Sequence, residues 1–262
     1  MLAFSSLLGN VEGQNIYRIW YDKPASYWEE ALPVGNGRIA AMVFGDPQLE
    51  QIQLNEETVS AGSPYQNYNE EAKAALPEMR RLIFEGKYEE AQNMAATKIL
   101  SQVGNEMPYQ TVGRLNIRYQ DHKKVNNYYR DLDISNAVAV TRYKVDGVEF
   151  TEETFASFTD QLVIRHIKAS KPGTINCELF FNTPMRDPKR SIYGKKGLRL
   201  EGITHGSRYF PGKVHYCADL DVKHKGGKVI TANDTLLSVQ GASELTLYIS
   251  MATNFVNYKD IS

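Results

Sequence analysis

Pairs of adjacent glutamates are the residues in this sequence that could carry acid–base chemistry. The pairs are Glu29-Glu30, Glu56-Glu57, Glu70-Glu71, Glu89-Glu90 and Glu152-Glu153. Hydrolysis of a glycosidic bond uses two carboxyl groups placed across that bond. Neighbours on a β-strand point to opposite faces, and acids in the first turn of a helix stabilise the helix. Only Glu56-Glu57 lies in a stretch typical of a polar loop, residues 54–58. This pair is therefore the exception among the five for which a role in a polar site is considered.

Aromatic residues gather near the start of the chain. They are Tyr17, Trp20, Tyr21, Tyr27 and Trp28, and Tyr65 and Tyr68 follow the Glu56-Glu57 stretch. Aromatic faces with a polar edge suit sugar rings, but β-sandwich cores also contain many aromatics. For any single one of these residues we favour packing in the core.

A glycine pattern resembles a dinucleotide-binding fingerprint. It reads Gly35-x-Gly37-x-x-Ala40, with Glu56 about twenty residues further on. The fingerprint requires a preceding strand and a following helix, yet Pro33 is a poor central-strand residue and Gly45-Asp46-Pro47 would end the helix early. We therefore expect no nucleotide cofactor.

Histidines and cysteines show no metal-binding spacing. The five histidines are scattered, at positions 122, 166, 205, 215 and 224, and there is no Cys-x-x-Cys pair. Cys177 and Cys217 lie in predicted strands, where free thiols are the favoured interpretation and a cross-strand disulfide is the alternative. We expect no metal site and no catalytic cysteine.

The composition limits the class of protein. The 262 residues carry 30 Lys and Arg against 31 Asp and Glu, a net charge of −1, with 42% hydrophobic residues. This balance argues against nucleic acid as a partner, and no apolar run is long enough to span a membrane. The start, residues 1–14, is expected to be a disordered leader or the remnant of a signal peptide. A signal peptide would place the protein in a periplasm or outside the cell.

The pattern along the chain predicts short strands interrupted by one helical insertion. Residues 15–54 consist of short apolar runs between turn signals. Residues 70–101 show helical spacing of apolar residues, with Asn69 as a cap, Gly86 as the end of the first helix and Pro77 as the start of a fresh turn. We therefore expect a two-helix insertion.

Beyond Gln110 the apolar residues alternate with a period of two. Asp146-Gly147 separates two such runs and predicts a tight hairpin, because a type I′ turn needs positive φ at both positions. Strands at this spacing, without helices between them, must pair antiparallel. The predicted fold is mostly β, a large antiparallel β-sandwich formed by residues 15–262.

Several stretches together resemble the amino-terminal domain of glycoside hydrolase family 95, which contains α-L-fucosidases and relatives acting on α-L-galactosides. They read YWEEALPVGNGRIAAMVFGDPQLEQIQLNEETV, LPEMRRLIFEGKYEEAQ and YKVDGVEFTEETFASFTDQLVIRHIKASKPG. Their order along nearly the whole chain is specific, although no single motif carries the resemblance. One departure is the lack of the Trp that many members have after the Leu-Asn-Glu motif, where this chain reads VSAGSP.

The resemblance implies a β-super-sandwich whose catalytic residues lie elsewhere. In that family an (α/α)₆ barrel, carboxy-terminal to this domain, performs inverting hydrolysis. We therefore expect no catalytic residue in this chain, which would be the amino-terminal piece of a longer enzyme. Its partners would be that barrel and a fucosylated or galactosylated glycan.

The polar residues expected on loops are candidates for one wall of the sugar-binding cleft. They are Asn36, Arg38, Asn55, Glu56 and Glu57. Asn36, between two glycines, is alternatively a left-handed turn residue, and Arg38 an ion-pair partner for one of the acids. Two rival hypotheses are a free-standing carbohydrate-binding module and a purely structural sandwich.

Overall fold

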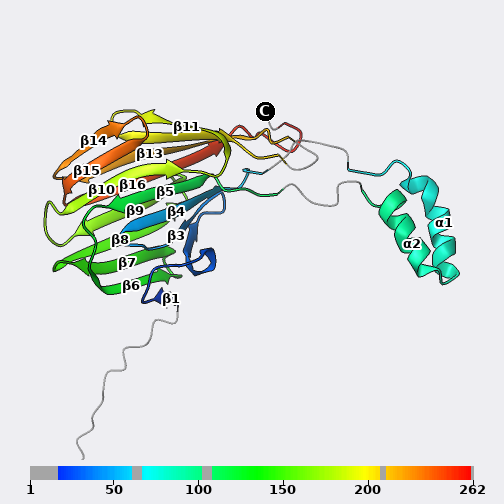
Figure 1. Cartoon of the computed structure of the whole chain (residues 1–262), viewed down its shortest axis with the longest axis horizontal. Helices are drawn as coiled ribbons and strands as arrows, with labels where there is room; N and C mark the ends of the chain where they lie inside the picture. Colours follow the sequence, from blue (N-terminus) through cyan, green and yellow to red (C-terminus); the bar gives the residue numbers. More distant parts are fainter. Residues whose placement is uncertain (1–16, 61–66, 102–107, 207–210, 261–262) are drawn as a thin grey trace, which may run out of the picture.

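Two antiparallel sheets packed face to face form the body of the protein (Figure 1). The computed structural model describes residues 17–60, 67–101, 108–206 and 211–260. The expected leader, residues 1–14, and Tyr65 lie outside these ranges. Within them the prediction of a mostly-β antiparallel sandwich is confirmed.

The larger sheet has nine strands. Their order across the sheet is β1 (Arg18–Tyr21), β6 (Val125–Asp133), β7 (Val138–Val145), β8 (Val148–Ser157), β9 (Leu162–Ala169), β16 (Glu244–Thr253), β13 (His215–Lys225), β12 (Gly197–Ile203) and β11 (Arg186–Tyr193).

The smaller sheet has seven strands. Their order is β14 (Lys228–Asn233), β15 (Leu236–Ala242), β10 (Ile175–Asn182), β5 (Gly113–Tyr119), β4 (Leu49–Glu56), β3 (Ile39–Val43) and β2 (Leu32–Gly35). The single-turn helix η1 (Trp28–Glu30) precedes β2.

Alternation along each strand builds the core between the sheets. In β16, Leu245, Leu247 and Ile249 are fully buried, whereas the residues between them are part-exposed on the outer face. β10 repeats the pattern from the opposite sheet with Ile175, Cys177 and Leu179. Each such aliphatic side chain contributes about 1.5–3 kcal/mol on burial, so the in-phase residues hold the two sheets together.

The hairpin predicted at Asp146-Gly147 is confirmed. Both residues have positive φ, 48° and 79°, and Val145 pairs with Val148 across the two-residue turn. Residues 35–40, which resembled a dinucleotide fingerprint, instead comprise the end of β2, the turn at 36–38 and the start of β3. The residues after β2 form a strand and not a helix, so the strand-then-helix context that the dinucleotide fingerprint requires is not found here.

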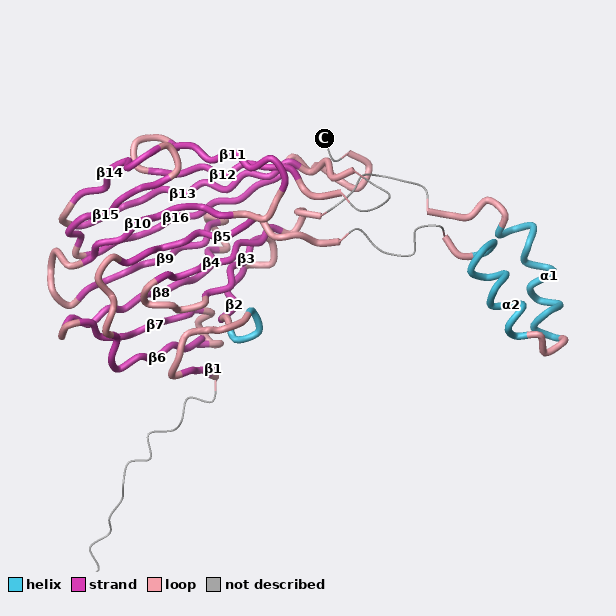
Figure 2. The backbone as a smooth tube through the Cα atoms, in the orientation of Figure 1, coloured by secondary structure: helices cyan, strands magenta, loops and turns pink. Residues whose placement is uncertain are grey.

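The helical insertion forms an arm that stands apart from the sandwich (Figures 1 and 2). It consists of α1 (Ala72–Phe84), α2 (Tyr88–Met94) and the π-helical turn η2 (Ala95–Ile99). Gly86, with φ of 76°, follows the last residues of α1 as expected. The prediction that Pro77 starts a fresh helical turn is wrong, because Pro77 lies inside α1. The prediction of Asn69 as the cap is wrong, because the N-cap of α1 is Glu71; Asn69 Oδ1 accepts a hydrogen bond from the Glu71 N–H at 3.0 Å in the turn before the helix.

The sandwich has two ends of different construction. The arm end, from which the arm extends, holds the β2–β3 turn (36–38), the end of β4, the β8–β9 turn (158–161) and the end of β16 with residues 254–258. The turn end holds tight turns at 44–48, 146–147, 170–174 and 226–227. All five candidate site residues come from segments at the arm end.

Candidate functional site

A cluster of polar residues joins the two sheets at the arm end. We call it the rim cluster; it consists of Arg38, Glu56, Thr58, Met251 and Thr253. Arg38 Nη2 donates to the Met251 carbonyl oxygen at 3.0 Å, and its Nε lies 3.6 Å from Glu56 Oε1. The alternative proposed for Arg38, an ion pair with one of the acids, is therefore confirmed.

Glu56 is held by donors on its own strand end. Its Oε2 accepts from the Thr58 N–H at 2.8 Å and from the Thr58 hydroxyl at 2.6 Å. Because that hydroxyl has one hydrogen, the Thr253 hydroxyl donates in the 2.5 Å contact between the two threonines. Only 3% of Glu56 is exposed, so its carboxylate serves the joint between the sheets rather than reaching solvent.

Asn36 also has a structural role. Its Oδ1 accepts from the N–H groups of Arg38 and Ile39 at 3.1 and 2.9 Å, and its Nδ2 donates to the Ser157 carbonyl oxygen at 2.8 Å. The left-handed position of this turn is Gly37, with φ of 93°, and not Asn36 as the alternative reading had it. The side-chain bonds of Asn36 fix the β2–β3 turn against the end of β8.

Asn55 and Glu56 are not on a loop, which corrects the expectation for this stretch. They belong to β4 and pair with Ala40 and Ile39 of β3, because the strand continues to Glu56. Glu57 follows the strand; its N–H donates to the Arg38 carbonyl oxygen at 2.9 Å and its side chain is exposed. Of the five candidates, only Glu56 is buried; Asn36, Arg38 and Asn55 are partly exposed and Glu57 is exposed.

Tyr109 lies beside this stretch and was not identified from the sequence. Its hydroxyl donates to the Glu56 carbonyl oxygen at 3.0 Å. Burial raises the pKa of the Tyr109 hydroxyl, and a hydrogen bond with Asn55 opposes that shift. Tyr109 stays protonated at neutral pH and offers an aromatic surface that is 54% exposed next to Asn55.

Exposed hydrophobic side chains are concentrated toward the arm end. Those at its turns and strand ends are Tyr109, Ile134, Phe158, Val256 and Tyr258. Within the part of the chain that the structure describes, no large hydrophobic side chain in the turns of the turn end is more than a third exposed. Tyr193, the last residue of β11 toward the turn end, is 42% exposed, so the exposed apolar surface is concentrated at the arm end but not confined to it. A concentration of this kind is typical of a docking surface.

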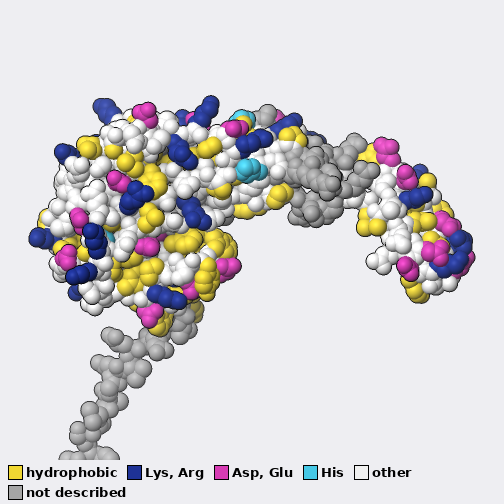
Figure 3. Space-filling model, in the orientation of Figure 1, with side chains coloured by type: hydrophobic (Ala, Val, Ile, Leu, Met, Phe, Trp, Pro, Cys, Tyr) yellow, Lys and Arg dark blue, Asp and Glu magenta, His cyan; other side chains and the backbone are white. Residues whose placement is uncertain are grey.

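The expectation that the early aromatics pack in the core is wrong for four of the five. Tyr17, Trp20, Tyr27 and Trp28 are each more than half exposed. The reason is that β1 is an edge strand and η1 lies on the surface, so neither places its side chains between the sheets. Figure 3 shows hydrophobic side chains gathered over η1 and the neighbouring strands. We call these four residues the aromatic patch.

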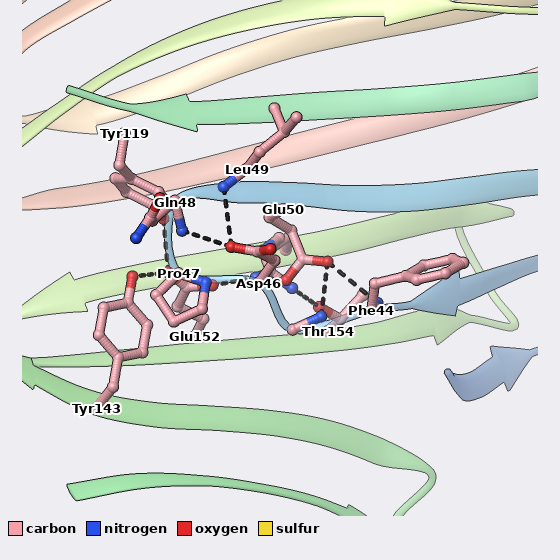
Figure 4. A network of polar contacts seen from close by, with 12 residues as sticks. Phe44, Asp46, Pro47, Gln48, Leu49, Glu50, Tyr119, Tyr143, Glu152 and Thr154 are labelled. Atoms are coloured by element: carbon pink, nitrogen blue, oxygen red, sulfur yellow. Dashed lines mark hydrogen bonds and ion pairs between the residues drawn. The ribbon is translucent and has the colours of Figure 1, made fainter. Parts of the chain in front are cut away.

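A second polar cluster, sealed between the sheets, was not foreseen. We call it the core cluster; it consists of Glu50, Tyr119, Tyr143 and Glu152, which Figure 4 labels, together with Arg165. Arg165 Nη2 donates to Glu50 Oε2 at 2.9 Å and also to Glu152 Oε2. The hydroxyls of Tyr119 and Tyr143 both donate to Glu152 Oε1, at 2.6 and 2.7 Å. The cluster therefore connects β4 and β5 of one sheet with β7, β8 and β9 of the other.

Burial dominates the electrostatics of the core cluster. It raises the pKa of Glu50 to about 7, in spite of the attraction of Arg165, and the nearby Glu152 carboxylate acts in the same direction. The pKa values of Tyr119 and Tyr143 are likewise raised well above their usual range by burial. A carboxyl with a pKa near neutrality could act in acid–base catalysis, but Glu50 and Arg165 are completely inaccessible to a substrate. The role of this cluster is structural.

The two thiols and the potential metal ligands among the described residues are further candidates for a site. Cys177 and Cys217 are free, so the disulfide alternative is wrong; they belong to opposite sheets. Burial raises the pKa of both thiols, that of Cys217 to about 12, so neither is a thiolate nucleophile at neutral pH. Among the described residues there is no group of three or more potential metal ligands, and no helix is long and apolar enough to cross a membrane.

Comparison with known proteins agrees with this architecture. The family model "Glycosyl hydrolase family 65, N-terminal domain" matches residues 19–258. "Alpha-L-fucosidase 2" of Arabidopsis thaliana is 31% identical over 94% of this chain and 31% of its own length. "Probable alpha-fucosidase A" of Aspergillus niger is 26% identical over 90% of this chain and 30% of its own. The chain thus spans about a third of the length of these curated relatives, and their names agree with the expected resemblance to family 95.

Proposed function

Because the chain belongs to the family described as "Glycosyl hydrolase family 65, N-terminal domain", we propose that it is the non-catalytic amino-terminal sandwich of an inverting α-L-fucosidase-like glycoside hydrolase. Its arm end packs on the catalytic helical barrel of the parent protein and forms one wall of the cleft that binds a fucosylated or galactosylated glycan.

The asymmetry between the two ends of the sandwich carries this proposal. The exposed hydrophobic side chains of the turns, and all five candidate polar residues, lie at the arm end, whereas the turns named at the turn end carry no large exposed hydrophobic side chain among the described residues. A protein surface that combines apolar area with polar groups at one end suits a docked domain, since a domain interface excludes water from its centre and keeps polar groups at its rim.

The five candidates divide into two roles within this proposal. Asn36 and Glu56 use their hydrogen-bonding groups inside the sandwich and position the turn. Arg38, Asn55 and Glu57 retain solvent-facing groups and form the wall itself. A carboxylate and an amide at such a wall accept and donate hydrogen bonds to sugar hydroxyls.

The proposal is tested in the full-length parent, comprising this chain and its barrel. Asn55→Ala and Glu57→Gln are each expected to lower kcat/KM for a fucosylated oligosaccharide about tenfold, the effect of one lost hydrogen bond in a closed site. Glu153→Gln, a change of the same kind at an exposed position on β8, is the matched control and should leave kcat/KM unchanged.

Thermal unfolding of each variant shows whether the fold is intact. Loss of turnover in Asn55→Ala and Glu57→Gln, with unchanged unfolding temperatures, supports the cleft wall. If both variants match the parent in turnover and stability, the arm end is not part of the cleft. If the isolated chain itself hydrolyses the substrate, its non-catalytic role is wrong.

We also propose that the parent is exported to a periplasm or to the outside of the cell. The apolar residues 1–10, which lie outside the described residues, support this as the remnant of a signal peptide. The mass of the protein recovered from its native host tests the proposal: a shortened amino terminus supports export, and an intact one contradicts it.

A further inference from the structure

A hollow of about 550 Å³ lies on the outer face of the nine-stranded sheet, outside both clusters. We call it the outer groove. The residues that matter for its chemistry are Tyr193, Asp219, Asp221, Lys223, Tyr248 and Ser250. They come from β11, β13 and β16, and their side chains point away from the core because they occupy the outward phase of each strand.

Strand register places the groove residues side by side. Tyr248 of β16 pairs with Asp221 of β13, which pairs in turn with Gly197 of β12, and Gly197 pairs with Tyr193 of β11. A side chain at Gly197 would place its Cβ 2.7 Å from the Tyr193 carbonyl oxygen and 3.3 Å from the Tyr193 ring. The nearest atom to that Cβ would be the Leu220 carbonyl oxygen, closer still, so no side chain fits on β12 between Asp221 and Tyr193.

Cationic side chains hold the two tyrosine rings. Lys223 Nζ lies 4.9 Å from the centroid of the Tyr248 ring, and the Arg199 guanidinium carbon lies 4.6 Å from that of Tyr193. Arg199 is itself fixed by two hydrogen bonds of 2.7 Å to the Asp219 carboxylate. Rings held in this way lose little conformational freedom when a ligand stacks on them.

The carboxylates give the groove its polarity. Asp219 is paired with Arg199, whereas Asp221 is exposed and forms no ion pair with any residue that the structure describes. Asp160 is a third acid in the lining, against the single unpaired cation Lys223. The net negative charge disfavours phosphates, nucleic acids and acidic sugars. The cations already placed over the Tyr193 and Tyr248 rings leave less room for a cation–π contact with a positively charged ligand.

We propose that the outer groove binds a neutral oligosaccharide. Its pyranose rings pack on Tyr193 and Tyr248, and its hydroxyls donate to Asp221 and exchange hydrogen bonds with Ser250. This combination of aromatic faces and hydroxyl-accepting carboxylates fits an uncharged polyol better than any ionic ligand. The site goes beyond the proposed docking role, because it lies on a sheet face and needs neither the barrel nor turnover.

Isothermal titration calorimetry of this chain tests the proposal without catalysis. The probes are 2′-fucosyllactose and lactose as neutral sugars, trigalacturonic acid as an acidic sugar and trilysine as a cationic peptide. We expect the neutral sugars to bind, and Asp221→Asn and Tyr248→Ala to weaken that binding about tenfold each. Tyr88→Ala, which removes an exposed tyrosine on α2 of the arm, is the matched control and should bind like the parent.

Circular dichroism and thermal unfolding establish that the variants are folded, and Asp221→Asn changes an exposed side chain that the core does not need. Binding of neutral sugars that is weakened by the groove variants alone supports the site. The proposal is overturned if no neutral sugar binds, if the groove variants bind as well as the parent, or if trilysine or trigalacturonic acid binds in preference. These results are independent of the turnover assay on the full-length parent, so either proposal can fail alone.

Discussion

The rim cluster and the core cluster use the same residue types in opposite environments. Each joins the two sheets through an arginine and glutamate, yet the side chains of Arg165, Glu50 and Glu152 are at most 1% exposed while that of Arg38 is 36% exposed. In the core, every charge must be met by a partner because water is absent. At the rim, water also solvates the charged groups. The Arg38 guanidinium can therefore contact a second protein surface. Burial therefore decides which arginine is structural and which is available for function.

The largest expected difference between the clusters is in stability. Arg165→Met would leave Glu50 and Glu152 buried without their cation and should lower the free energy of unfolding by about 3–5 kcal/mol. Arg38→Met, the same change at the rim, should cost no more than about 1 kcal/mol. Chemical denaturation of both variants measures the two values, and equal losses would show that burial does not separate the clusters.

The core cluster should also respond to pH. Burial raises the pKa of Glu50 from 4.5 to about 7, so the folded state holds a proton that the unfolded state has released. Stability is therefore fully present below about pH 4.5 and falls as the pH rises through about 7. Relative to Glu50→Gln, which does not titrate, the parent should lose up to about 3 kcal/mol over this window. Urea unfolding of both proteins across this pH range is the measurement, and a constant difference between them would contradict the raised pKa.

Within the rim cluster, the threonine bridge should have an intermediate effect. Thr58→Val keeps the shape of the side chain but removes one donor to Glu56 and the acceptor for the Thr253 hydroxyl. We expect a loss of about 1 kcal/mol in the free energy of unfolding. Thr174→Val, at a partly exposed position on the turn end, is the control and should lose less. A loss as large as that of Arg165→Met would mean that the rim is sealed as tightly as the core.

The smallest effect is expected at Glu57. Its side chain is exposed, so Glu57→Gln should change the free energy of unfolding by less than about 0.5 kcal/mol. If Glu57→Gln leaves the free energy of unfolding unchanged but lowers turnover in the full-length parent, Glu57 contributes to function and not to the stability of the fold. A stability loss above about 1 kcal/mol would instead assign Glu57 to the framework of the rim.

Much of the fold could be predicted from local sequence patterns, and two residues of the core cluster also carry a signal in the sequence. Glu152 lies in phase with buried Phe150, and Arg165 lies between buried Val163 and Ile167. A charge in the apolar phase of a strand indicates a buried pair. The second partner of Arg165, Glu50, could not be assigned, because 115 residues separate the two and only the assembled sandwich brings them together.

The candidate site was predictable only in part. The residue types around Asn55 and Glu56 indicated a polar site, but their place in β4 depends on pairing with β3, which local propensity does not contain. The exposure of Trp20 depends in the same way on β1 being an edge strand, and that of Trp28 on η1 lying on the surface. Residue chemistry was therefore accessible from the sequence, whereas exposure was set by neighbours distant along the chain.

Backbone hydrogen–deuterium exchange, compared between this chain alone and the full-length parent, tests the docking of the arm end most directly. We predict slower exchange in the parent at residues 36–38, 158–161 and 251–258, and unchanged exchange in the turns at 146–147, 170–174 and 226–227. Unchanged exchange at the arm end, or protection confined to the turn end, would contradict the account.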